Sequence, residues 1–354
     1  MKNIYLHILD PKPDNSAMVM ATVTRTHGST PQKPGSSALF GKDGLIFGTV
    51  GGGIVEGKVQ QLAMEAIKSK ESGHFQFNLD NDISNTDEAI CGGQISVLID
   101  ARPDNYISVF EQVKQSMENQ IPGILITVVT CLSEKTVLIN RYWMSNTYKP
   151  SIPLHFLEKI EPVITRLIYS AKSSEYKEME LSIPGEEPSS TFFLETIFPP
   201  AQLVIAGAGH IGRALAHLGS ILDFDVTIID DRPEYANAEN IPDADHILVK
   251  DIGEAMRKLR KSDNTYVVIV THGHKDDASA LKPCIGSDLA YTGMIGSRKK
   301  IATMRMNFIE KGWATEKEWD KIYTPIGIDI KSQTVQEIAV SIAAQLVLVR
   351  NSLK

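Results

Sequence analysis

Cysteine is scarce in this sequence. The 354 residues contain three cysteines, which are far apart, at Cys91, Cys131 and Cys284. Such spacing provides neither a disulfide framework nor a paired-cysteine metal knuckle, and it falls short of the cysteine array that binds iron–sulfur clusters. We therefore expect neither a structural zinc site nor an iron–sulfur protein.

Long apolar runs and an excess of positive charge are also missing. No run reaches the roughly 20 apolar residues of a membrane-spanning helix, and the segment MKNIYLHILDPKPD lacks the parts of a secretory signal. Acidic residues outnumber basic ones by 43 to 36, which gives a net charge of −7 and no electrostatic attraction for nucleic acid. We expect a cytoplasmic protein that binds neither nucleic acid nor a membrane.

The first half of the sequence alternates short β-rich runs with glycine-rich turns. These runs predict strands at 17–23, 37–40 and 45–50, a glycine turn leading into a strand within 90–101, and further strands in ILITVVTC and TVLINRYW. Between Val55 and Lys68 the apolar residues recur with a 3.6-residue period, which indicates a helix. This half is therefore predicted to be an α+β domain with an antiparallel sheet, over residues 1–199.

The composition changes between about Ser170 and Pro200, where serine, glutamate and proline become frequent. We interpret this stretch as a surface excursion and linker, although FFLETIF could add an edge strand to the first domain. The domain boundary is placed near Pro199-Pro200.

The second half alternates apolar strands with helices, which predicts a Rossmann-like, doubly wound parallel sheet over residues 200–354. A GxGxxG pattern, formed by Gly207, Gly209 and Gly212, follows one predicted strand and opens a helix. Gly207 would permit the tight turn, Gly209 would let a pyrophosphate approach the backbone, and Gly212 would let helix and strand pack closely.

An acid also ends the next predicted strand, at Asp230, 23 residues beyond Gly207. It would accept hydrogen bonds from ribose hydroxyls and so favour NAD over NADP, although Arg232 weakens that preference. The alternative is a fold that keeps the dinucleotide loop without using it.

A histidine-rich loop, THGHKDD, follows a later strand of the second half. His272, His274 and Asp276 are candidate metal ligands or acid–base groups, because imidazole and carboxylate serve both purposes. The alternative is a set of polar residues in a solvated loop. The basic run in MIGSRKK suits an anion, or is a solvated charge run.

A triple glycine, Gly51, Gly52 and Gly53, stands between a predicted strand and a helix N-terminus. The spacing to Gly57-Lys58 is that of a nucleotide-triphosphate loop, but Val59 lacks the magnesium-binding hydroxyl and Glu56 would repel a triphosphate. Backbone amides here could hold a single phosphate, or the glycines could serve only a tight turn.

Cys91 precedes the paired Gly92-Gly93 at the start of another predicted strand. Flexible backbone there could expose its sulfur, whereas Cys131 ends an apolar run and is expected to pack as a small hydrophobe. Spacing alone leaves open whether Cys91 is structural or reactive.

Ordered blocks of the sequence resemble the XdhC/CoxI family, accessory proteins of xanthine dehydrogenase and related molybdenum hydroxylases. The resemblance lies in ATVTRTHGSTPQKPGSSALF, DGLIFGTVGGGIVEG, ICGGQISVLID, LVIAGAGHIGRALAHLG, VTIIDDRPEYA, VVIVTHGHKDD, YTGMIGSRKK and PIGIDIKSQTVQEIAVSIAAQLV. The region 105–199 carries no matching motif.

The resemblance implies a chaperone of the molybdenum cofactor (molybdopterin). Such a protein holds the cofactor while a cysteine desulfurase installs its sulfido ligand, and then delivers it to an apo-hydroxylase. The family's cofactor-associated cysteine corresponds to Cys91, and a soft thiolate suits contact with molybdenum. Gly51 to Glu56 would hold the phosphate and the pterin amines, in the first domain or between the two domains. The resemblance also suggests a homodimer.

Two other functions remain open at this stage. The chain could be an NAD(P)-dependent oxidoreductase that uses the Rossmann-like domain, or a cofactor-free adaptor between desulfurase and hydroxylase. The last segment, Thr334 to Arg350, has a helical apolar face, which indicates either a buried closing helix or a dimer contact.

Overall fold

The computed structural model describes residues 3–10, 17–79, 93–133, 136–150, 152–170, 175–183 and 186–352. By its internal contacts the chain divides into two units, Lys2–Pro199 and Pro200–Lys354. The first unit is α+β with antiparallel sheets and the second is built on a parallel sheet, which confirms the predicted fold class. No helix in the described ranges is long and apolar enough to cross a membrane.

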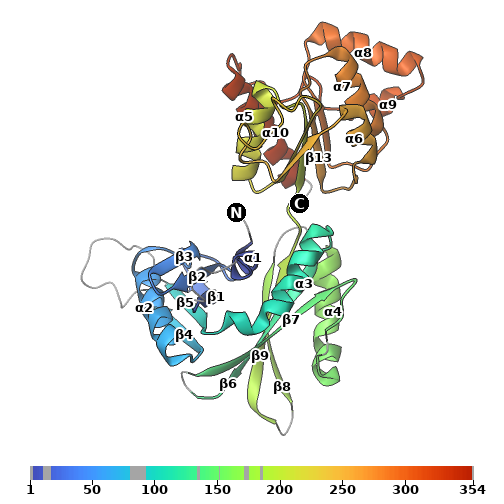
Figure 1. Ribbon diagram of the computed structural model, residues 1–354. Coiled ribbons are helices and arrows are strands. Elements are labelled where there is room, and N and C mark those ends of the chain that lie inside the picture. The colour runs from blue at the N-terminus through green and yellow to red at the C-terminus, as the bar shows by residue number, and fades with distance from the viewer. Residues whose placement is uncertain are drawn as a thin grey trace. The chain divides into compact units, whose positions relative to one another are not determined.

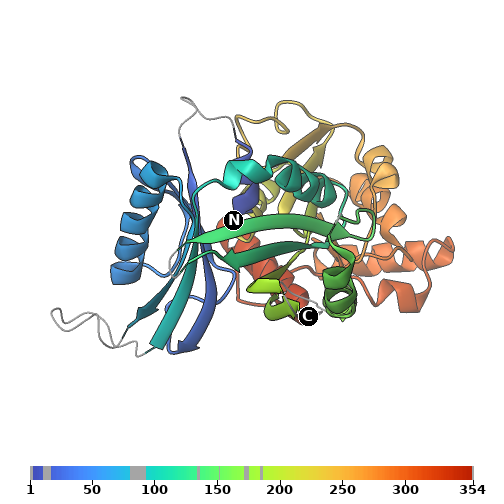
Figure 2. The same ribbon diagram turned by 90° about the horizontal axis from the view of Figure 1, so that it is seen from below.

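The first unit contains a five-stranded antiparallel sheet in the order β3-β2-β1-β5-β4. Its strands are β1 (Val19–Gly28), β2 (Ser37–Gly41), β3 (Gly44–Gly48), β4 (Gly73–Asn78) and β5 (Gly93–Asp100). Helix α2 (Gly53–Ser69) covers one face of this sheet (Figures 1 and 2), because Val55, Val59 and Ala63 repeat at helical spacing and are buried on it.

A second antiparallel sheet of the first unit has the order β7-β6-β9-β8. Its strands are β6 (Gly123–Cys131), β7 (Val137–Ser145), β8 (Tyr176–Ile183) and β9 (Glu186–Ile197), with α4 (Leu154–Ser170) against it. The expectation of a linker between 170 and 200 is therefore wrong. Phe192 to Ile197 of FFLETIF lie in β9, an inner strand, whereas β8 and β7 are the two edge strands.

Helices α1 (Ile4–Ile8) and α3 (Ile107–Glu118) join the two sheets of the first unit through one apolar cluster. Tyr5 and Phe110 from the helices, Met20 from the first sheet and Trp143 from the second are all buried in it. A buried ion pair also links the sheets, since Arg141 Nη2 of β7 lies 3.1 Å from the Asp100 carboxylate of β5.

The second unit is a five-stranded parallel sheet in the order β12-β11-β10-β13-β14. Its strands are β10 (Gln202–Ala206), β11 (Asp225–Asp230), β12 (His246–Val249), β13 (Thr265–Ile269) and β14 (Tyr291–Met294). The chain adds β11 and β12 on one side of β10 and then β13 and β14 on the other side. Ligands of such sheets usually bind at this change of direction, at the carboxyl end of β10.

Helices cover both faces of the parallel sheet (Figure 1). Helices α5 (His210–Ile221) and α10 (Val335–Ser352) pack on one face, where Ile342 and Leu346 are fully buried. The other face carries α6 (Ile252–Lys258), α7 (His274–Leu281), the short η2 (Lys282–Cys284), α8 (Arg298–Glu310) and α9 (Glu316–Trp319). The predicted closing helix is therefore present as α10, with its apolar face in the core.

Candidate functional sites

The glycine-rich loops of the first unit leave from one edge of the five-stranded sheet. Strand β1 ends at Gly28 opposite Gly93, where β5 begins. Strand β3 ends at Gly48, opposite the start of β2 at Ala38. Because all these pairs are antiparallel, the segments after β1, after β3 and before β5 emerge at the same edge.

The segment after β1 touches both predicted glycine motifs. A Cβ on Gly51 would lie 2.7 Å from Pro31 Cγ, and a Cβ on Gly93 would lie 2.5 Å from the carbonyl oxygen of Ser29. Neither glycine can gain a side chain without displacing this segment. Gly51 and Gly93 therefore pack against the same short loop, while Cys91 and Gly92 lie outside the described residues.

Cys131 is exposed at the end of β6. The expectation that it packs as a small hydrophobe is therefore wrong. Burial along β6 stops at Val129, two residues before the cysteine, so the apolar run extends further than the core that covers it.

The triple glycine leads into α2 with its backbone in conformations that side chains rarely adopt. Gly51, Gly52 and Gly53 have φ values of 135°, 65° and 57°. A Cβ on Gly52 or Gly53 would meet no atom within 4 Å, and no side chain caps the helix at Gly52. The space beside these two glycines is thus open, at the positive end of a 17-residue helix.

Glu56 is held by the loop that precedes it. Thr49 Oγ1 donates to Glu56 Oε2 at 2.8 Å and accepts from the Gly51 N–H at 3.1 Å. The carboxylate expected to accept from pterin amines therefore also fixes the shape of the glycine loop, and its other oxygen has no hydrogen bond within the described residues.

The dinucleotide-type loop of the second unit has three glycines in different environments. A Cβ on Gly207 (φ 117°) would lie 2.5 Å from the Val270 carbonyl oxygen, and one on Gly212 would lie 1.9 Å from the Gly207 carbonyl oxygen. Both positions require glycine. Gly209, the N-cap of α5, has nothing within 4 Å, so a ligand phosphate could approach the backbone there.

Asp230 is already saturated with hydrogen bonds. One carboxylate oxygen accepts from the Ala208 N–H at 2.7 Å and from Arg232 Nη2 at 2.9 Å, and the other accepts from Arg232 N and Nε at 3.0 and 2.9 Å. Four hydrogen bonds fill the acceptor sites of a carboxylate, and Asp230 is only 1% exposed. The expected bond to a ribose therefore requires Arg232 to move away.

The pKa of Asp230 reflects this environment. Burial alone would raise the pKa, but the hydrogen bonds from Arg232 and from the Ala208 amide hold it below its usual range. Arg232 itself lies over the ring of Tyr235, 4.2 Å from its centroid, which helps to keep the guanidinium in place.

The histidine-rich loop does not gather a metal site. His272, His274 and Asp276 are exposed, and no three His, Cys, Asp or Glu side chains in the described parts of the chain are placed to hold a metal ion. Both the metal-ligand and the acid–base interpretations of these residues therefore stay predictions.

The buried acid of this loop is Asp277. It accepts from Thr271 Oγ1 at 2.6 Å and pairs with Lys300 of the basic run. Asp277 is fully buried, and it ties the end of β13 to the start of α8. Helical period is the signal that would have found it, because Asp277 shares a face with the buried Ala280 and Leu281.

A partly buried acid, Glu195 of β9, was also missed by the sequence analysis. It accepts a hydrogen bond from the Tyr5 hydroxyl. Burial raises its pKa to about 7, and the bond to Tyr5 and the charge of Arg141 offset this only in part. Glu195 was not predicted as a functional residue because it lies in a stretch that we expected to be a linker.

Taken together, a Rossmann-type unit follows an α+β unit whose glycine-rich loops share one sheet edge. Comparison with known families agrees with this class. The model of the XdhC Rossmann domain matches residues 203–346, and that of the XdhC and CoxI family matches residues 13–78. These matches span more than half of the chain, and the chain belongs to the XdhC and CoxI family.

Two individual relatives match nearly the whole of this chain, but at low sequence identity. A Bacillus subtilis 168 protein, named as a probable subunit of xanthine dehydrogenase, is 24% identical over 339 residues, which cover 95% of this chain and 94% of that protein. The protein YqeB of Escherichia coli K12 is 24% identical over 351 residues, or 99% of this chain and 47% of YqeB. The chain thus spans about half the length of YqeB.

A solved structure shares the fold. The crystal structure of a Bacillus halodurans protein named xanthine dehydrogenase has a TM-score of 0.70 with 24% identity, and the match covers 97% of this chain and 94% of the other. At this identity the likeness supports the architecture of the chain and not a shared ligand.

Proposed function

We propose that this protein is an accessory factor in the maturation of a xanthine dehydrogenase-type molybdenum hydroxylase, and that its first unit binds the molybdenum cofactor. Membership of the XdhC and CoxI family supports the maturation role. The observation that carries the cofactor proposal is the shared sheet edge, where open space beside Gly52 and Gly53 adjoins the N-terminus of a helix without a side-chain cap.

The loop fits the phosphate of a molybdopterin. Backbone amides at a helix N-terminus bind such groups through hydrogen bonds and the helix dipole. The open space beside Gly52 and Gly53 leaves room for the ligand, and the second oxygen of Glu56 can accept from pterin amines. The bound cofactor would supply the redox-active metal of the hydroxylase, while this chain positions it and shields it.

Cys91 is the proposed thiolate contact of the cofactor. The chain enters β5 at Gly93, two residues after Cys91, on the same sheet edge as the glycine loop. Sulfur is a suitable ligand for a soft, sulfur-bound metal. A cysteine desulfurase and the hydroxylase are the proposed partners, and a homodimer is the proposed assembly.

The alternative function of an NAD-dependent oxidoreductase has one observation against it. The acid that would accept from the ribose of NAD is occupied by Ala208 and Arg232. A cofactor-free adaptor remains the alternative if neither ligand binds.

Molybdenum and pterin content tests the proposal directly. The protein is purified from a host that makes the cofactor, together with Cys91→Ala and, as a matched control, Cys131→Ala, since Cys131 is also a free cysteine. We expect cofactor in the wild type and in Cys131→Ala, and a loss of about tenfold or more in Cys91→Ala. Absence of metal and pterin from all three proteins would sink the cofactor proposal.

A further inference from the structure

A cationic groove lies on the α7–α8 face of the second unit, away from the dinucleotide-type loop. The cavity measures about 590 Å³ and is lined by residues of α6, α7, η2 and α8 and of the turn after α8. None of its lining residues belongs to the segment Gly207–Gly212. Lys282 and Lys311 follow the ends of α7 and α8, on the side of the sheet opposite the carboxyl ends of the strands.

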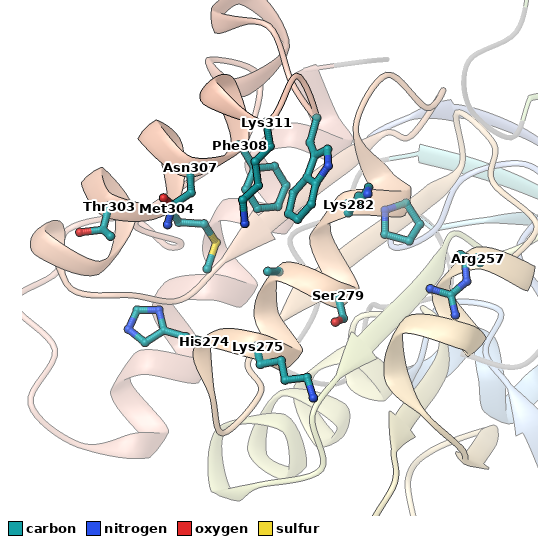
Figure 3. Close-up of a pocket in the computed structure, with 13 residues that line it drawn as sticks. Arg257, His274, Lys275, Ser279, Lys282, Thr303, Met304, Asn307, Phe308 and Lys311 are labelled. Atoms are coloured by element: carbon teal, nitrogen blue, oxygen red, sulfur yellow. The ribbon is translucent and has the colours of Figure 1, made fainter.

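Positive charge gathers in this groove although the whole chain is acidic. Arg257, Lys275, Lys282 and Lys311 line it together with His274, and no aspartate or glutamate does (Figure 3). Within the described residues, none of these four cations forms a salt bridge. A concave surface with one sign of charge concentrates the positive potential and favours an anion.

Trp313 brings two of the cations together. The Nζ atoms of Lys282 and Lys311 lie 4.0 and 4.7 Å from the centroid of its ring. The indole attracts each ammonium through its electron-rich face but carries no net charge to neutralise them. The two ammonium groups therefore lie at one ring with no acidic side chain in the groove lining, and this arrangement favours the binding of an anion.

The groove also has an apolar wall. Met304 and Phe308 of α8 are buried beneath it, and Figure 3 shows them across from Ser279 and Lys282. The volume falls in the range of small-molecule sites, which combine apolar walls with a few polar groups. A protein partner would in general require a broader and flatter surface than this cavity.

We infer that this groove binds a small organic phosphate, a molecule that joins a phosphate to an apolar ring. The phosphate meets Lys282 and Lys311, and the ring packs against the partly exposed Trp313. This site is separate from the cofactor loop of the first unit and does not depend on the proposed function.

Intrinsic fluorescence provides the test, because Trp143 and Trp319 are buried whereas Trp313 is partly exposed. The full chain is titrated with adenosine 5′-monophosphate, with adenosine and with inorganic phosphate. We expect the monophosphate to change Trp313 fluorescence at roughly tenfold lower concentration than either half-molecule. The affinity should also fall as salt is raised.

Variants locate the binding. Lys282→Met and Lys311→Met keep the aliphatic stems but remove the charges, and each should weaken monophosphate binding by about tenfold, since charge-assisted contacts are of that strength. Lys317→Met, which removes an exposed lysine outside the groove, should leave binding unchanged. Trp313→Phe should abolish the fluorescence change.

Three results would overturn the inference. The first is no binding of the monophosphate, and the second is binding that the two lysine variants leave intact but Gly209→Val removes, because the ligand then occupies the dinucleotide-type loop. The third is tighter binding of a poly-glutamate peptide of matched charge, because the groove is then a docking surface for acidic protein segments.

Discussion

At the scale of single residues, Arg232 decides what Asp230 can do. The pair is bidentate, with both nitrogen–oxygen distances at 2.9 Å. Such a geometry uses the carboxylate more completely than a single contact does. Asp230 stands where a dinucleotide-binding fold places its ribose acceptor, so the side chain two residues later controls access to it.

Removing Arg232 should therefore open the second unit to NAD. Arg232→Ala removes one of the two hydrogen bonds on each carboxylate oxygen and leaves the two backbone bonds in place. We expect NAD to bind about tenfold more tightly than to the wild type. Isothermal titration calorimetry measures this. Arg232→Lys is the comparison, because it keeps the charge but cannot make the bidentate pair. If Arg232→Ala binds NAD no better than the wild type, Asp230 is not what limits binding.

At the scale of elements, two glycines at the start of α2 differ in whether the backbone conformation requires a glycine. Gly52 and Gly57 both face open space, but Gly52 has a φ of 65° whereas Gly57 lies in ordinary helical conformation. Only Gly52 needs the freedom of a residue without a side chain.

The same substitution should thus have opposite effects at the two positions. Gly57→Ala removes a flexible residue from a helix and should raise the free energy of unfolding by about 0.5–1 kcal/mol. Gly52→Ala strains the backbone and should lower it by about 1–3 kcal/mol. Urea denaturation compares the two variants with the wild type, and equal shifts would contradict the backbone explanation.

Local patterns predict most elements of this chain, and their failures have physical causes. The strand-loop-helix at Gly207–Gly212 is predictable because apolar period and glycine spacing agree. Strand β8 and the first half of β9 were not predicted because the stretch is rich in serine and glutamate, and half of a strand's residues can face away from a core. The Asp230–Arg232 pair was not predictable, since three successive charged residues, Asp230 to Arg232, do not reveal which of them is buried.

At the scale of the whole molecule, the described apolar clusters fall within one unit or the other. Two of them lie in Pro200–Lys354 and four in Lys2–Pro199. Each unit thus has a core of its own, which is the physical condition for independent unfolding. Each core also holds a buried tryptophan, Trp143 in the first and Trp319 in the second.

The ionisation of Glu195 should make the stability of the first unit, and not that of the second, depend on pH near neutrality. Its pKa is about 7 in the folded chain against 4.5 for the free group, so the folded state keeps a proton that the unfolded state releases. The stability of the first unit should therefore fall as pH rises from about 4.5 to about 7, by at most about 3 kcal/mol. The second unit lacks this group.

Thermal unfolding at pH 5 and pH 8 tests both statements together. We expect two transitions, of which the one reported by Trp143 moves to lower temperature at pH 8. Glu195→Gln keeps an acceptor for Tyr5 without the ionisable proton, and it should remove that shift while the other transition stays in place. Trp143→Phe assigns the signals. A single transition would contradict independent units, and a pH shift that survives in Glu195→Gln would show that another buried group is responsible.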